Sequence, residues 1–172
     1  MLWFKFIKIG YGSGINQVGS GMDRVRIKSG YLSNRIGFGW QAYHAKLATI
    51  DNLKKRGFQL VNRCYLCHCE NESHSHLFFQ CSFMRLLWRA MMLWVGITRR
   101  PRNLRHELEW IYSHCKGKAL LSRLERTVFV AIIYHGWIER NYRVFRNLVR
   151  DVPTICKQIQ FEIMCRYYGR VM

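Results

Sequence analysis

Acidic residues and prolines are scarce in this chain of 172 residues. Asp and Glu number only 10 against 28 Lys and Arg, which gives a formal net charge of +18 and a pI of about 10.1. Such an imbalance attracts polyanions, so nucleic acid is the expected partner, ahead of an acidic membrane or protein. The chain has only two prolines, Pro101 and Pro153. This scarcity favours long helices over a loop-rich fold.

The sequence also has no long apolar run, and its first residues do not show the pattern expected of a secretory leader. The N-terminal MLWFKFIKIG is interrupted by Lys5 and Lys8 and is not followed by a small-residue cleavage site. The sequence contains no stretch of about 18 uncharged apolar residues, which is the length that a membrane-spanning helix needs. Seven cysteines is an odd number, unlike a disulfide framework. We therefore expect an intracellular protein, placed in the nucleus, with free thiols and no membrane partner.

The hydrophobic pattern predicts a mainly α fold. Hydrophobic residues make up 49% of the chain, which is enough for a core. Two short helices are expected within 36–57, the second capped by Thr49 and ended by Gly57. Further helices are expected from Ser82 to Gly96 and over 103–114, 118–148 and 154–168. We divide the chain into a flexible, basic, glycine-rich lead-in (1–35), a zinc-binding domain (36–97) and a basic helical extension (98–172).

Two of these helices carry apolar stripes at helical spacing, which predict their buried faces. The first stripe is formed by Phe83, Leu86, Leu87, Ala90, Met91 and Trp94. The second is formed by Leu121, Leu124, Val128, Ile132, His135, Ile138, Tyr142 and Phe145. Within it, His135 is expected to be a core histidine and not a catalytic one, and Arg140 is expected to lie off the stripe.

Residues 64–81, CYLCHCENESHSHLFFQC, hold four Cys and three His. Structural zinc takes four Cys or His ligands in a tetrahedron. Cys64 and Cys67, two residues apart, can face one ion from a tight turn, and His76 and Cys81 can return to it from a helical turn. The spacing predicts a Cys3His zinc site of Cys64, Cys67, His76 and Cys81. A filled shell leaves no place for water, so we expect the ion to be structural.

Other ligand sets remain open at this point. His74 is the main alternative to His76, while His68 and Cys69 are expected to stand outside the site. An iron–sulfur cluster on Cys64, Cys67, Cys69 and Cys81 has an unusual spacing. A redox-active Cys-x-x-Cys would need a βαβ context, which the pattern does not supply.

Three segments together resemble a known family. LATIDNLKKRGF (47–58), the Cys/His segment and SFMRLLWRAMMLWVGI (82–97) resemble the reverse transcriptase zinc-binding domain of plant LINE-type, non-LTR retrotransposons. AIIYHGWIERNYRVFRN (131–147) is similar to the region after that domain, so the resemblance covers about 36–150. It favours His76, which precedes L-F-F-x-C. Tyr65 departs from the family pattern, which usually has Pro there.

The resemblance implies a role in holding template RNA or target DNA near a polymerase. No Y/F-x-D-D motif of a polymerase occurs in the chain, and no nucleophile–base pair is recognisable, so we expect neither an enzyme nor a small-molecule substrate. Whether the partner is RNA or DNA stays open. The candidate contact residues are Lys54, Lys55, Arg56, Arg63, Tyr65, Arg85 and Arg89. The competing interpretations are a structural or protein-interaction zinc domain and a retrotransposon remnant without function.

Overall fold

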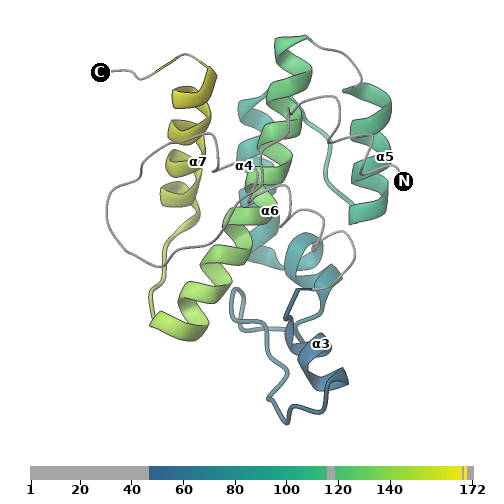
Figure 1. Ribbon diagram of the computed structural model, residues 1–172, viewed down its shortest axis with the longest axis vertical. Coiled ribbons are helices and arrows are strands. Elements are labelled where there is room, and N and C mark those ends of the chain that lie inside the picture. Colours follow the sequence, from purple (N-terminus) through teal and green to yellow (C-terminus); the bar gives the residue numbers. More distant parts are fainter. Residues whose placement is uncertain (1–46, 116–118, 168, 170–172) are drawn as a thin grey trace, which may run out of the picture.

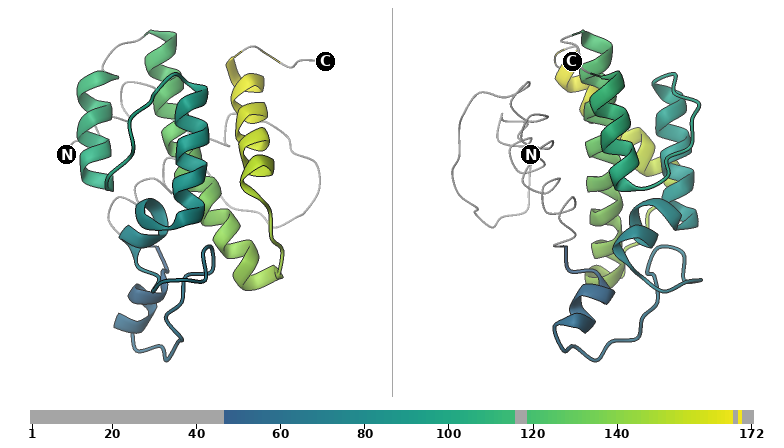
Figure 2. Two further views of the ribbon diagram at one scale, coloured as in Figure 1. Left: turned by 180° about the vertical axis from the view of Figure 1, so that it is seen from behind. Right: turned by 90° about the vertical axis from the view of Figure 1, so that its right-hand side faces the viewer.

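The computed structural model describes residues 47–115, 119–167 and 169. α6 (Leu120–Arg146) is the longest helix, and α4 (Ser82–Trp94) and α7 (Val152–Tyr167) pack against it and against each other (Figure 1). α5 (Leu104–His114) lies beside the N-terminal part of α6 (Figure 2). The short helix α3 (Ile50–Lys55) and the π-helical turn η1 (His76–Gln80) lie near the C-terminal half of α6. The predicted fold, helices with a Cys3His cluster between them and no strand in the described ranges, is confirmed.

The core is formed where α4, α6 and α7 meet. Ile155, Ile159 and Ile163 give α7 one buried stripe. Trp88 of α4 is fully buried between the rings of Phe79 and Phe129, and its indole N–H donates to the Phe78 carbonyl over 2.7 Å. Trp88 therefore joins η1 to α6 through one side chain.

The predicted stripe of α4 is wrong by about one residue. Leu87 and Met91 are buried, but Leu86 is 57% exposed, Ala90 is exposed and Trp94 is 37% exposed. The observed buried face consists of Met84, Leu87, Trp88, Met91 and Met92. Apolar residues occupy almost every position of this helix except Arg85 and Arg89, so two neighbouring stripes fit the helical period equally well. The contacts of Trp88 and Met84 with η1 and α6 select the observed one.

The predicted stripe of α6 is right in its middle and wrong at its ends. Val128, Ile132 and His135 are buried, whereas Leu121 is 58% and Phe145 75% exposed. At 1.5 Å per residue, the 27 residues of α6 span about 40 Å, and α4 and α7, with 13 and 16 residues, cover only part of that length. Arg140, expected off the stripe, is buried because it pairs with a buried glutamate described below.

Side chains and glycines near the helix ends explain the boundaries. Asn103 caps α5 by accepting from the His106 N–H, and Asp151 does the same for α7 from the Thr154 N–H. Gly57 (φ +92°) and Gly96 (φ +79°) follow α3 and α4 in left-handed conformations that suit glycine. α4 begins at Ser82 as expected, with Cys81 as its N-cap, and the C-cap of α3 is Arg56, one residue before the expected Gly57.

The division into 1–35, 36–97 and 98–172 stays a prediction. The lead-in and the first helix expected within 36–57 lie outside the described residues. In the described part, α4 from the second segment packs directly against α6 and α7 from the third. Among the described helices, none combines the length and the apolar character that a membrane crossing requires.

Candidate metal centre

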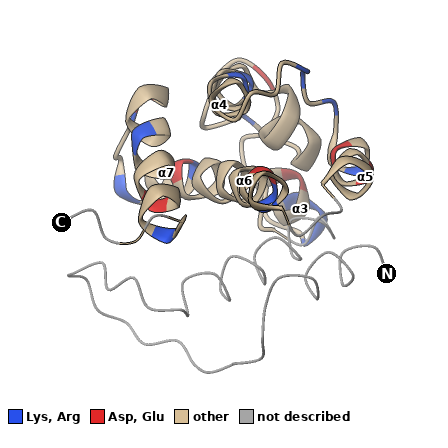
Figure 3. Ribbon diagram, turned by 90° about the horizontal axis from the view of Figure 1, so that it is seen from above, with Lys and Arg blue, Asp and Glu red and all other residues tan. Residues whose placement is uncertain are grey.

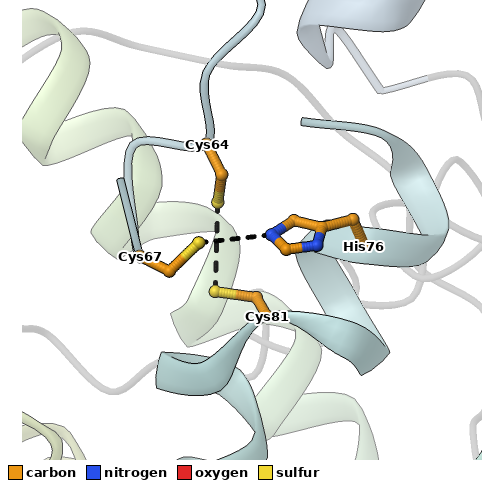
Figure 4. A group of neighbouring side chains, drawn as sticks. All are labelled: Cys64, Cys67, His76 and Cys81. Atoms are coloured by element: carbon orange, nitrogen blue, oxygen red, sulfur yellow. Dashed lines mark hydrogen bonds between the residues drawn. The ribbon is translucent and has the colours of Figure 1, made fainter. Parts of the chain in front are cut away.

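Four side chains converge from three separate segments. Cys64 and Cys67 lie on the turn after an extended stretch, His76 opens η1, and Cys81 lies just before α4. Figure 4 shows their sulfur and nitrogen atoms directed at one another. The four ligand atoms all lie within 4.8 Å of one another. Cys64, Cys81 and His76 are buried and Cys67 is half-buried, so the group is shielded from water.

The dimensions of this group fit a tetrahedral zinc ion. With Zn–S near 2.3 Å and Zn–N near 2.0–2.1 Å, tetrahedral ligands lie about 3.8 Å apart for two sulfurs and about 3.6 Å for sulfur and nitrogen. Cys64 Sγ is 3.9 Å from Cys81 Sγ, and Cys67 Sγ is 3.3 Å from His76 Nε2. Three thiols and an imidazole are also the donors that structural zinc prefers, so the residues present fit that ion.

The π-helical turn η1 brings the side chains of His76 and Cys81, five residues apart, to the same side of the chain. Five residues along a regular α-helix turn through about 500°, which places the two side chains about 140° apart around the axis. Here the Cys81 N–H donates to the His76 carbonyl over 2.7 Å, closing a wider, i→i+5 turn. This wider turn lets His76 and Cys81 face the same point. Sequence reasoning expected a helical turn here but not its width.

The turn carrying Cys64 and Cys67 is closed by its own backbone. The His68 N–H donates to the Cys64 carbonyl over 2.8 Å, and the Cys64 N–H donates to the Glu70 carbonyl over 2.8 Å. His68 has φ +56°, a left-handed conformation that a non-glycine residue adopts only under local constraint. Both cysteine side chains are thereby aimed at His76 and Cys81.

A carboxylate stands behind the imidazole of His76. Glu70 Oε2 lies 3.3 Å from His76 Nδ1, while His76 Nε2 faces the sulfurs. His76 Nε2 is the ring nitrogen placed to bind a metal ion, and Nδ1 lies near the Glu70 carboxylate without a hydrogen bond to it. Glu70 thus places a carboxylate beside the imidazole, a contact that the sequence pattern did not predict.

The two buried thiols behave as a pair. The Cys64 thiol donates to Cys81 Sγ, and this hydrogen bond, with burial, raises the pKa of Cys64. The same hydrogen bond stabilises the Cys81 thiolate and lowers the pKa of Cys81. A metal ion entering the site therefore displaces the proton held by Cys64.

The side chains considered as alternative ligands lie outside this group. His74 contacts the ring of Phe78, with 5.0 Å between ring centroids. The exposed Cys69 turns its thiol to the Cys67 carbonyl, and His68 is exposed. Cys115 and Cys156 are buried among the helices, where burial raises the pKa of both thiols, to about 12 for Cys115. The structure thus assembles the Cys3His set and not a four-cysteine set.

The residues proposed for nucleic-acid contact are all on the surface. Lys54, Lys55 and Arg56 end α3, and Arg85 and Arg89 occupy one side of α4, four residues apart. Arg63 is exposed, although its Nε donates to the His68 carbonyl over 2.8 Å. Tyr65 is 37% exposed, whereas the nearby aromatic residues Phe78, Phe79 and Trp88 are buried in the core.

Sequence reasoning missed the ion pairs that attach this centre to α6. Glu72 and Glu139 are fully buried, and each accepts from arginines of the C-terminal half of the chain. Acidic residues are rare in this chain, so Glu72 inside the Cys/His segment and Glu139 next to the apolar stripe of the long helix were signals of buried pairing.

In the part of the chain that the structure describes, the fold and the site define a mainly helical protein with a Cys3His cluster. In addition, residues 28–88 match the family described as zinc-binding in reverse transcriptase. This match covers about a third of the chain, contains all four members of the cluster and ends at Trp88. No curated protein and no solved structure matches the chain. The family match and the cluster together support a zinc-binding module.

Proposed function

We propose that this protein is a zinc-stabilised nucleic-acid-binding module without catalytic activity of its own. It would derive from the C-terminal region of a plant LINE-type reverse transcriptase polyprotein and act in the nucleus. In this proposal zinc closes the Cys3His cluster and fixes α3, the Cys64–Cys67 turn and the start of α4. The exposed Lys and Arg side chains around that scaffold then bind the phosphates of RNA or DNA.

The observation that carries the proposal is the separation of charge between surface and interior. Twelve exposed Lys and Arg side chains stand against three exposed Asp and Glu among the described residues. Glu72, Glu107 and Glu139 are fully buried, and each is paired with arginine. Figure 3 shows Lys and Arg spread over α4, the loop after it and α7. Because each buried acid is paired with an arginine that is not exposed, the exposed side chains keep the net positive charge of the described residues and include few acids.

The test compares two pairs of exposed arginine or lysine residues in the full chain. Arg85→Gln with Arg89→Gln removes two charges beside the metal centre, and Arg123→Gln with Lys157→Gln removes two charges from α6 and α7. Binding to a single-stranded RNA and to a DNA duplex is titrated at rising salt. The first pair is expected to weaken binding and to lower the slope of log K against log salt by about 1.4 for single strands or 1.8 for duplex.

The control pair separates a defined interface from general attraction by net charge. Equal losses from both pairs would show attraction without an interface at α4. Absence of salt-dependent binding by the zinc-loaded wild-type protein would overturn the proposal. Retention of full binding after chelation would show that the scaffold does not need the metal.

One observation favours a second candidate, a protein-interaction domain. On α4, Leu86 and Leu93 are 57% and 51% exposed, seven residues apart, and Trp94 next to them is 37% exposed. Large apolar side chains along one exposed side of a helix are typical of a protein contact. If α4 binds a protein, changing Leu86 and Leu93 to Gln should abolish that contact and leave nucleic-acid binding unchanged. If the two changes affect nucleic-acid binding alone, the protein-interaction candidate is rejected.

A further inference from the structure

The Cys64–Cys67 turn is held from outside by an arginine of α6. Arg143 Nη1 donates to the Leu66 carbonyl over 2.9 Å and approaches the Tyr65 carbonyl at 3.4 Å. These two carbonyls belong to the residues between the first pair of cysteines. The position of both thiols therefore depends on a side chain about 80 residues further along the chain.

Arg143 is itself fixed on several sides. Its Nε donates to Glu139 Oε1 over 2.8 Å, and its guanidinium lies 4.6 Å from the centre of the Phe83 ring at the start of α4. Glu139 is fully buried and also accepts from the backbone N–H and the Nε of Arg150. The planar guanidinium group, with five donors in a fixed arrangement, suits such a site better than the ammonium of lysine.

A second connection joins the loop between Cys67 and His76 to the same helix. The fully buried Glu72 accepts from Arg140 Nη2 over 2.8 Å and from Arg140 Nε over 3.2 Å. Glu72 Oε1 also accepts from the Ile50 N–H, the first residue of α3, over 3.0 Å. The Arg140 guanidinium lies 5.7 Å from the centre of the Tyr65 ring. Two successive turns of α6 thus hold both halves of the loop that carries the cysteines.

We propose that Arg143 and Arg140 are positioning residues of the metal centre, and that metal binding is coupled to the order of the C-terminal half of α6. Both arginines lie outside residues 28–88, the part that matches the zinc-binding family. Because coupling is reciprocal, α6 raises the affinity of the cysteines for zinc, and zinc stabilises residues 139–150. The proposal rests on zinc binding at the Cys3His cluster, as proposed above.

The first arm of the test measures zinc affinity of full-length variants by competition with a chromophoric chelator. Arg143→Met keeps an unbranched side chain but removes all the hydrogen-bond donors of the guanidinium group. The variant is expected to bind zinc 10–100-fold more weakly, as for other residues that orient metal ligands. Arg146→Met is the matched control, since Arg146 is exposed and lies over the Tyr142 ring at 5.2 Å. Arg143→Lys, which keeps one charge and a donor for the carbonyls, is expected to recover part of the affinity.

The second arm measures amide hydrogen exchange of the wild-type protein with and without zinc. Slower exchange of residues 139–150 on zinc addition is expected, along with the slowing in 64–81. The proposed coupling would be overturned if Arg143→Met bound zinc as tightly as the wild-type protein. It would also be overturned if zinc did not change the hydrogen exchange of residues 139–150. If Arg143→Met does not fold, the zinc affinity of Arg143→Lys and the hydrogen exchange of the wild-type protein test the coupling instead. Failure of the wild-type protein to bind zinc at all would instead overturn the proposed function.

Discussion

The segment around the metal centre (residues 47–81) and the helical bundle (α4, α6 and α7) are built on different principles. In the first, residues 54–61 are all exposed, including Phe58, Leu60 and Val61. Its regular elements, α3 and η1, have only six and five residues. In the bundle, three helices of 13 to 27 residues bury a continuous apolar face.

This difference shows where stability comes from in each region. Helices as short as α3 are unstable alone, so the segment 47–81 needs metal ligands and buried polar contacts such as Glu72 with Arg140, in addition to the apolar side chains of η1 that it adds to the core. The bundle depends on apolar area removed from water. Treatments that act on thiols or charges should therefore affect the first region, and treatments that alter packing should affect the second.

The largest expected effect comes from removing one member of the cluster. Cys81→Ser should weaken zinc binding by more than about 100-fold, since even residues that only orient ligands contribute 10–100-fold. Hydrogen exchange should then become fast in 47–81 while the buried stripe of α7 stays protected. Cys69→Ser is the matched control, because Cys69 is exposed and its thiol faces a backbone carbonyl. Equal losses from both substitutions would show that the four-residue ligand set is wrong.

Breaking the Glu72–Arg140 pair tests the polar contribution to the same region. Glu72→Gln keeps an oxygen for the Ile50 N–H but leaves the buried Arg140 charge without its partner. We expect a loss of about 3–5 kcal/mol in the free energy of unfolding, measured in urea with zinc present. The double change with Arg140→Met should recover part of that loss, because no unpaired charge remains. Independent, additive effects of the two changes would contradict direct pairing.

Lowering the pH should act on the metal-centre region through its thiols. The pKa of Cys64 is raised by its hydrogen bond to Cys81, so Cys64 keeps its proton through neutral pH and the metal must displace it. Zinc affinity should therefore fall as pH falls, by about tenfold per pH unit for each displaced proton. The measurement is zinc affinity from pH 8 to pH 6, together with the zinc-dependent rise in melting temperature. A pH-independent affinity would mean that no thiol proton is released.

The bundle was predictable from the sequence in outline, because helical period and capping residues are local signals. The long helix was expected over 118–148 and is found at Leu120–Arg146, and the last helix was expected over 154–168 and is found at Val152–Tyr167. The buried face of α4 was not predictable in the same way. Ten of its thirteen residues are apolar, so the choice of face depends on where η1 and α6 lie.

The metal cluster was predictable because its four members lie within eighteen residues in a spacing that only a few ligand sets satisfy. The contacts that hold this cluster from α6 were not, because they join residues more than 65 positions apart. Arg140 and Arg143 look in the sequence like members of a general basic surface. Only the arrangement of the helices shows that these two are directed inward, while Arg85 and Arg89 remain exposed.

The smallest expected effect comes from a change in packing inside the bundle. Gly136 of α6 lies against Met84 of α4, and a Cβ there would meet the Sδ and Cε atoms of that buried side chain. Gly136→Ala adds about 1 kcal/mol of helix propensity but overpacks the contact by about 1–3 kcal/mol, so a net loss of about 1 kcal/mol is expected.

Combining Gly136→Ala with Met84→Ala removes the atoms that the new methyl group meets. Double-mutant coupling between the two sites should therefore be favourable, measured by urea unfolding of both single variants and the pair. Because this contact belongs to the bundle, zinc affinity of Gly136→Ala should equal that of the wild-type protein. A large drop in zinc affinity would show that packing between α4 and α6 also sets the metal centre, and the contrast between the two regions would no longer hold.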